Sequence, residues 1–260
     1  MPDHLTFIIH SVDERSSLDL LVKSLEDIQR LLRHVDYAIY RQGSRMGWAV
    51  HSLKSSAPTL TLAPRRDDRQ AVAIVGDGLR LVTEGTDQPP QYFTEPALEN
   101  LKKMSRLFRG ESRARSLSVL VDHNKVATIE DDIADKADRV LSSGYHNLGS
   151  LQGRLDAINV HRTPTATIWD RVSGAPVRCR FPREETDRVK ELLQQLVTVT
   201  GDVHYFSNGR PRSVTDVVAI EQLATPDQYL EKAGFGTIPD RRVREIGAAE
   251  WLAEVRGTRE

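Results

Sequence analysis

The chain has 260 residues, enough for one large domain or two smaller ones, each with a hydrophobic core. It carries 36 Lys and Arg against 37 Asp and Glu, and this formal net charge of −1 argues against a dedicated binder of nucleic acid or of anionic membranes. A composition of 39% hydrophobic and 28% charged residues excludes a disordered or fibrous protein, and the single Cys179 excludes a disulfide framework and a cysteine zinc site.

No apolar run approaches the roughly 20 residues that cross a bilayer. The first residues also carry acidic side chains where a secretion signal would be basic and then apolar. We therefore expect a cytoplasmic protein without a membrane segment.

Residues 1–147 are predicted to form an N-terminal α/β domain. Its first strand is the apolar, β-branched run 5–10, and Ser16 or Ser17 then caps a long helix. The apolar stripe of that helix consists of Leu21, Leu25, Ile28, Leu32 and Val35. The elements predicted next are strands at 36–41, 46–53 and 58–63 and a helix at about 68–83, which Gly76 and Gly78 weaken.

A third helix is predicted to begin at Thr94, which can act as its N-cap. Its inward side chains are Leu98, Leu101, Met104, Leu107 and Phe108. A strand follows at 116–121. A fourth helix is predicted at 128–142, because an acidic first turn suits the positive end of the helix dipole.

Residues 148–223 follow a different pattern. The predicted elements are strands at 149–160, 164–170 and 176–181, a helix at 183–196, and strands at 197–206 and 210–221. The Asn208-Gly209 pair is the preferred sequence of a two-residue type I′ hairpin turn. Five strands with a helix after the third indicate an OB-fold-like barrel.

Residues 224–260 are rich in Pro, Gly and charge and are predicted to be an extended C-terminal tail. Two short helical segments are expected in it, near 226–233 and 247–256. The expected fold class is therefore α+β, with an N-terminal α/β domain, a five-stranded OB-like barrel and this tail.

Five segments of the barrel region carry a recognisable pattern, at 149–158, 168–170, 177–182, 197–201 and 209–214. Together they resemble a family of poorly characterised bacterial OB-like proteins, whose tails end in a small-acidic-aromatic-leucine-x-x-x-arginine motif. Residues 249–256 have that pattern, with Trp251-Leu252 where commoner members have Tyr-Val or Tyr-Leu. The resemblance implies an antitoxin-like protein of a toxin-antitoxin system, whose partner is a PIN-domain ribonuclease.

The sequence contains no Gly-x-Ser-x-Gly, P-loop, His-Glu-x-x-His or dinucleotide-binding motif. We therefore expect a protein that is not an enzyme, with no catalytic residues and no cofactor. No two histidines have the i, i+4 spacing of helical metal ligands, so no metal site is expected. The acidic cluster of Glu130, Asp131, Asp132, Asp135 and Asp138 is interpreted as a solvated helix face rather than a magnesium site.

Side chains alternate between the inside and the outside of the predicted barrel. The inward set on the third strand is Val177, Cys179 and Phe181. The residues expected on the outer face are Arg154, Trp169, Arg178 and Arg180, a combination that could stack a base and hold phosphates. In the alternative, Trp169 packs against the N-terminal domain and the arginines pair with nearby carboxylates, namely Asp156, Asp170 or Glu184.

A second basic patch lies at 102–115, with six basic residues against Glu111, a local net charge of +5. Its members are Lys102, Lys103, Arg106, Arg109, Arg113 and Arg115. These side chains could dock nucleic acid or an acidic protein, or they could simply complement the dipole at a helix C-terminus.

In the tail, one helical turn carries apolar and basic side chains side by side. These candidate partner-binding residues are Trp251, Leu252, Val255, Arg256 and Arg259. One amphipathic turn is too short to be stable alone, so it rests either on this protein or in a partner's groove. A ribonuclease of PIN type gathers carboxylates around a metal ion, which an inserted Arg256 could pair with and mask.

Overall fold

The structure is a computed structural model that describes residues 3–12, 17–40, 47–54, 58–65, 69–110 and 113–223. The chain divides into one compact unit at Met1–Glu221 and another at Gln222–Glu260. Within its described residues, the first unit contains five α-helices and two five-stranded sheets, which confirms a mixed α+β protein. The two predicted helical segments of the tail lie outside the described residues.

The first sheet has the strand order β2-β3-β1-β4-β5, and its described pairings are all antiparallel. Its strands are β1 (Leu5–Ser11), β2 (Trp48–Lys54), β3 (Thr59–Pro64), β4 (Ala114–Val121) and β5 (Asn124–Ile129). The first region is therefore α+β rather than α/β with parallel strands.

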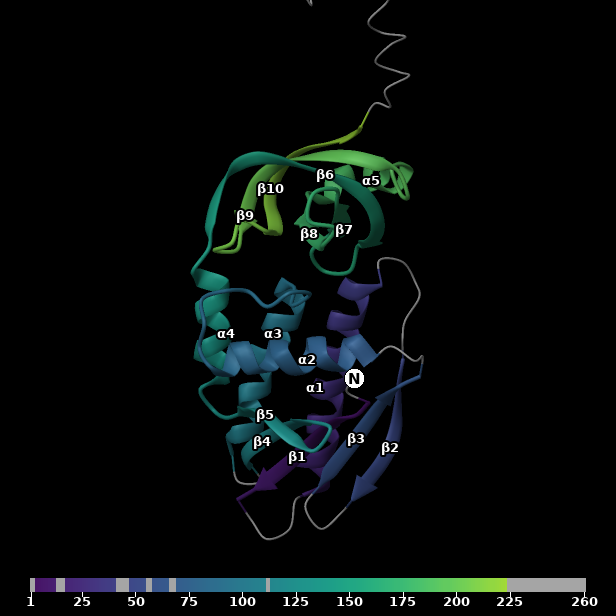
Figure 1. The fold of residues 1–260 in the computed structure, drawn as a ribbon. Helices are drawn as coiled ribbons and strands as arrows, with labels where there is room; N and C mark the ends of the chain where they lie inside the picture. Colours follow the sequence, from purple (N-terminus) through teal and green to yellow (C-terminus); the bar gives the residue numbers. More distant parts are fainter. Residues whose placement is uncertain are drawn as a thin grey trace, which may run out of the picture. The chain divides into compact units, whose positions relative to one another are not determined.

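Four helices lie beside this sheet (Figure 1) and share one hydrophobic core with it. They are α1 (Leu18–Ile39), α2 (Arg69–Thr83), α3 (Glu95–Met104), which a short 3-10 helix η1 (Ser105–Phe108) extends, and α4 (Ile133–Ser142). Ser17 is the N-cap of α1, and its hydroxyl accepts a hydrogen bond of 3.1 Å from the Leu20 backbone N–H. None of the described helices is long and apolar enough to span a membrane.

Two predicted elements of this region are wrong. Residues 36–39 of the strand expected at 36–41 are the end of α1, whose buried face continues through Val35 and Ala38, and residue 41 lies outside the described residues. The helix expected at 128–142 begins only at Ile133, because residues 124–129 form strand β5. The first segment is rich in strand-forming residues and the second in helix-forming residues. In both, tertiary packing overrides this local preference.

Strand β5 follows β4 through a two-residue turn, with Val121 paired to Asn124. Both turn residues have positive φ, 44° at Asp122 and 70° at His123. This is the conformation of a type I′ turn, which usually contains glycine. The Asp122 carboxylate accepts hydrogen bonds from the backbone N–H groups of Asp3 and His4, so the start of the chain supports the turn.

The second sheet closes into a barrel with the order β10-β8-β7-β6-β9 (Figure 1). Its elements are β6 (Tyr145–Asn159), β7 (Thr165–Asp170), β8 (Pro176–Arg180), η2 (Arg183–Glu185), α5 (Thr186–Glu191), β9 (Leu196–Tyr205) and β10 (Pro211–Gln222). Strand β8 pairs with β7 in antiparallel fashion and with β10 in parallel. The predicted strands of this region are thus present, whereas the helix is shorter than 183–196.

The turn between β9 and β10 differs from the prediction. The N–H of Phe206 donates to the Arg210 carbonyl and the N–H of Gly209 donates to the Phe206 carbonyl, each at 2.9 Å. Within this fully described turn, Gly209 has a φ of +80° and Asn208 does not have a positive φ. The hairpin therefore has three loop residues with glycine in the left-handed position, instead of a two-residue type I′ turn.

Helix α2 contains Gly76 and Gly78, and both glycines pack closely against side chains of other segments. A Cβ atom at Gly78 would be 2.0 Å from the Cε2 atom of the buried Phe93 ring. At Gly76 it would be 2.6 Å from a methyl group of Val121. The glycines thus allow the close packing of this helix.

Replacing Gly78 with alanine should destabilise the protein by about 1–3 kcal/mol, since the clash with Phe93 outweighs the gain of up to about 1 kcal/mol in helix propensity. Urea unfolding measures the change. The control is Asp77→Ala on the exposed side of the same turn, which should alter the free energy of unfolding by less than about 0.5 kcal/mol. Equal or higher stability of Gly78→Ala would contradict the close approach of Phe93.

Candidate functional site

The outer face of strands β6, β7 and β8 carries the residues that the sequence singled out. In the register, Trp169 lies opposite both Arg154 and Pro176, and Arg178 lies opposite Thr167. The predicted inward residues are buried in the barrel core, namely Val177, Cys179 and Phe181. Burial raises the pKa of the Cys179 thiol, so it stays protonated and acts as a small apolar residue.

Trp169 points away from the barrel interior but is not exposed to solvent. Only 7% of the residue is accessible, and its ring packs on Tyr37 of α1 with a centroid distance of 5.1 Å and an interplanar angle of 43°. The Tyr37 hydroxyl donates a hydrogen bond of 2.6 Å to Asp156 Oδ2 of β6. The expectation of an exposed indole is therefore wrong, and the alternative, in which Trp169 packs on the N-terminal region, is confirmed.

The electrostatics of this contact keep the phenol in its neutral form. Burial raises the pKa of Tyr37, and the hydrogen bond to the Asp156 carboxylate raises it further. Tyr37 is therefore a neutral hydrogen-bond donor at neutral pH.

The three arginines of this face have different surroundings. Arg154 donates a hydrogen bond of 2.5 Å to Gln194 Oε1, whereas Arg178 is partly buried and Arg180 is exposed. Among the described residues, none of the three forms an ion pair with Asp156, Asp170 or Glu184. The pairing that the sequence left open as an alternative is therefore absent.

The basic patch at 102–115 separates into two parts. Lys102 forms an ion pair of 2.7 Å with Asp138, which raises the pKa of the ammonium group, and Arg106 forms one of 2.7 Å with Asp27. The members that remain exposed are Lys103, Arg109, Arg113 and Arg115. Two of the six basic residues, one on α3 and one on η1, are thus used in structural contacts.

Asp27 explains why Arg106 is structural. Its side chain is fully buried, and its carboxylate lies 2.7 Å from Arg106 and 3.4 Å from Arg30. The Asp27 backbone carbonyl accepts a hydrogen bond of 2.9 Å from the Asn100 amide, which ties α1 to α3. Burial raises the pKa of Asp27, and the two guanidinium groups oppose that rise.

Basic residues from three elements act electrostatically on His34. Burial lowers its pKa to about 4, and the nearby charges of Arg178, Arg33 and Lys103 lower it in the same direction. We call Arg33, Lys103 and Arg178 around His34 the α1 basic cluster. The structure thus brings together Lys103 and Arg178, which the sequence had placed in separate patches.

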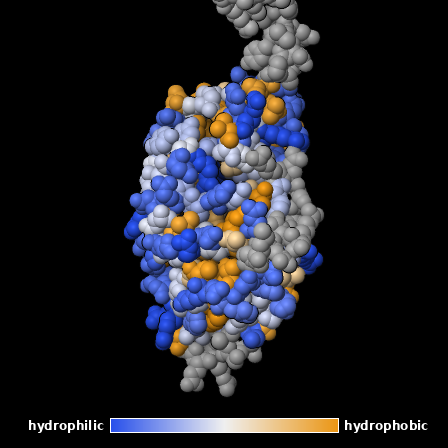
Figure 2. Space-filling view, viewed as in Figure 1, coloured by the Kyte–Doolittle hydropathy of each residue, from blue (hydrophilic) through white to orange (hydrophobic). Residues whose placement is uncertain are grey.

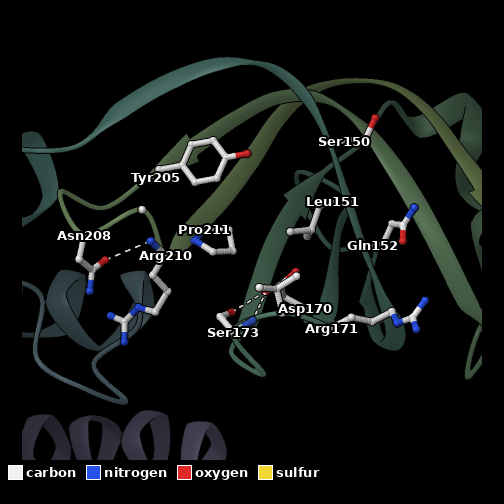
Figure 3. Close-up of a pocket in the computed structure, with 12 residues that line it drawn as sticks. Ser150, Leu151, Gln152, Asp170, Arg171, Ser173, Tyr205, Asn208, Arg210 and Pro211 are labelled. Carbon is white, nitrogen blue, oxygen red and sulfur yellow. Dashed lines mark hydrogen bonds between the residues drawn. The ribbon is translucent and has the colours of Figure 1, made fainter.

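A hollow of about 890 Å³ lies on the barrel between β6, the β7–β8 turn and the β9–β10 turn (Figure 3). Its buried polar groups already have structural partners. Asp170 accepts hydrogen bonds of 2.6 and 2.7 Å from the N–H and hydroxyl of Ser173, and Arg210 donates to the carbonyls of Pro90 and Phe93. Burial lowers the pKa of Arg210 to about 10, so it is still charged at neutral pH.

An apolar groove of about 650 Å³ separates α1 from β2 and β3. Its apolar lining includes Val22, Leu25, Trp48, Val50 and Leu53. On the face seen in Figure 2, hydrophobic side chains gather in separate patches among hydrophilic ones. Strand β2 is an edge strand of its sheet, so this groove borders an unpaired edge.

No known family model matches the chain, and no curated protein matches it either. The candidate partner-binding residues of the tail lie outside the described residues.

The residues that sequence reasoning missed are Tyr37, Arg33 and His34. All three lie on α1, but residues 36–41 were predicted as a strand, which placed Tyr37 in the wrong element. Arg33 and His34 flank the apolar stripe of the helix, and nothing local indicates that a barrel strand packs beside them.

Replacing Arg106 with serine should lower the free energy of unfolding by about 1–2 kcal/mol, because the buried Asp27 carboxylate loses its closest partner. The loss stays below that of a fully buried pair, since Arg106 is half exposed and Arg30 remains. Thermal and urea unfolding measure it.

The matched control is Arg109→Ser, an exposed arginine three residues along the chain, which should leave stability nearly unchanged. Equal stabilities of the two variants would show that the Arg106–Asp27 pair contributes nothing.

Proposed function

We propose that this chain is a non-enzymatic, antitoxin-like binding protein that holds a PIN-type ribonuclease with residues 224–260. The observation that carries the proposal is the burial of Trp169 under Tyr37. It argues against the main competing function of the barrel, which is to stack a nucleic-acid base on this indole. Burial of an indole of roughly 200 Å² stabilises by up to about 5 kcal/mol. Stacking one base on an aromatic ring contributes only about 1–3 kcal/mol, so exposing Trp169 to bind a base is unfavourable.

The OB-like assignment is supported by the connectivity of the barrel. Its first strand, β6, pairs with the second and the fourth strands, β7 and β9. Its third strand, β8, pairs in parallel with the fifth, β10, and α5 lies between the third and fourth strands. This order is that of an OB-fold, whose usual ligand face is formed by the second and third strands. In this chain that face is the one against which α1 packs.

The position at which the barrel ends in the sequence favours a separate binding element in residues 224–260. Its described core residues run from Leu151 to Ile220, and β10 ends at Gln222. The tail therefore begins where the closed barrel ends. Its motif places Trp251, Leu252 and Val255 beside Arg256. The indole would anchor in a partner groove, and the guanidinium would pair with the carboxylates of the ribonuclease site.

A complex of this kind belongs in the cytoplasm, where a ribonuclease meets its RNA. In this proposal the chain needs no cofactor of its own, because it acts by occupying the partner's site.

The second candidate is a single-stranded nucleic-acid binder, which the α1 basic cluster favours. Arg33, Lys103 and Arg178 all act electrostatically on His34 from three elements, and the exposed Arg180 follows Arg178 on the same face of β8. Such a surface would hold phosphates without base stacking, so its binding would depend strongly on salt and little on sequence.

A chain that ends at residue 223 should fold as the full chain does and should no longer bind the proposed PIN-domain ribonuclease. Trp251→Ala should weaken binding by about 2 kcal/mol, whereas Arg256→Ala should chiefly restore ribonuclease activity in the complex. Titration calorimetry and an RNA-cleavage assay separate the two effects. Arg241→Ala, in the tail but outside the motif, is the control and should change neither. Unfolding of the truncated chain would show that the tail belongs to this protein's own core.

If the α1 basic cluster binds nucleic acid, a labelled oligonucleotide should show salt-dependent fluorescence anisotropy with the full chain. Lys103→Ser and Arg178→Ser should each reduce the salt slope by about one and weaken binding equally for all sequences. Arg171→Ser, an exposed arginine in the β7–β8 turn outside both basic surfaces, is the charge-matched control. Flat anisotropy at low salt would reject this candidate and leave the ribonuclease proposal standing.

A further inference from the structure

Three side chains with metal-ligating atoms meet on the outer face of strands β6 and β9. His146 of β6 lies directly opposite His204 of β9, and Asp202 precedes His204 by two residues on the same side of the strand. The two imidazole rings are stacked, with centroids 5.1 Å apart and an interplanar angle of 18°. The cluster is built on two paired strands, which fix its backbone.

The distances suit a single small cation. The ligating atoms of the three side chains all lie within 4.8 Å of one another. Asp202 Oδ2 is 2.9 Å from His146 Nδ1 and 3.5 Å from His204 Nε2. A tetrahedral zinc ion with bonds of about 2.1 Å separates its ligand atoms by about 3.4 Å, so small side-chain rotations complete the site.

We propose that His146, Asp202 and His204 bind a divalent transition-metal ion of the zinc type. Two imidazole nitrogens and one carboxylate oxygen are the donors that such ions prefer over magnesium or calcium. Three protein ligands leave a fourth position for water. The site is open to solvent, since the side chain of His146 is 64% exposed and those of Asp202 and His204 are 27% and 23% exposed.

The neighbouring charges are compatible with a bound cation. Arg212 lies near His204, and its guanidinium is paired with Glu95 at 3.7 Å, which reduces its repulsion of a metal ion. The Thr215 hydroxyl lies 3.0 Å from His204 Nε2, so this hydrogen bond has to break when that nitrogen ligates an ion.

The spacing of histidines on a helix gives no hint of this site. The signal available in the sequence is Asp202-x-His204 in a predicted strand, which places both side chains on one face. The third ligand comes from a strand far away in sequence, and only the β6–β9 pairing brings it there. A metal ion at this place would link the first and fourth strands of the barrel, independently of the proposed function.

Isothermal titration of the full chain with ZnCl₂ at pH 7.5 should give one saturable site. His146→Ala, Asp202→Asn and His204→Ala should each weaken it by at least the roughly 10–100-fold that the loss of an outer-shell partner costs. Cobalt(II) should give the visible absorption of a tetrahedral ion with the wild type and not with these variants. His146 is exposed enough that its replacement tests the site even if His204→Ala fails to fold.

The matched control is His51→Ala. The His51 and His4 rings are tilted by 58° with centroids 4.6 Å apart, and Asp122 lies 3.9 Å from His4, so this is a second histidine pair near a carboxylate. Its loss should leave zinc affinity unchanged. Absence of saturable binding, unchanged affinity in His146→Ala, or loss of binding in His51→Ala would each overturn the proposal.

Discussion

The contact between Tyr37 and Trp169 determines what the rest of the molecule can do. Helix α1 contributes Leu20 and Ile28 to the core of the first sheet, and farther along it places Tyr37 against the barrel. One rigid helix therefore serves two packing surfaces. Because the indole is covered and Asp156 is bonded to the phenol, the outer face of β7 is a structural contact rather than an open ligand surface.

In this chain the surroundings of each charged residue matter more than the net charge. A net charge of −1 conceals a buried carboxylate held by two guanidinium groups, and it conceals a histidine, His34, whose pKa is lowered by burial and further by nearby cations. A buried charge needs a partner, whereas an exposed one contributes little to folding. Arg106 and Arg109 are only three residues apart and differ in this respect, which no count of charges along the sequence reveals.

Alternation and turn residues predicted the barrel strands and the inward side of β8, because these patterns are local. The β4–β5 hairpin was not predictable, since Asp122 and His123 take left-handed conformations without glycine and depend on the start of the chain for support. The outward direction of the Trp169 side chain was predictable. Its burial under Tyr37 was not, because Tyr37 lies far away in sequence. Contacts between distant elements are what a single sequence leaves undetermined.

The parallel pairing of β8 with β10 has a consequence for how the protein folds. Arg178 pairs with Ser213, and α5, β9 and the β9–β10 hairpin lie between them in the sequence. Long-range parallel pairs form slowly, because the intervening chain must be ordered first. During synthesis the barrel cannot close until β10 has left the ribosome, and by then residues 224–260 are already being made. A nascent chain therefore exposes the apolar interior of β7 and β8 for longer than that of the first sheet.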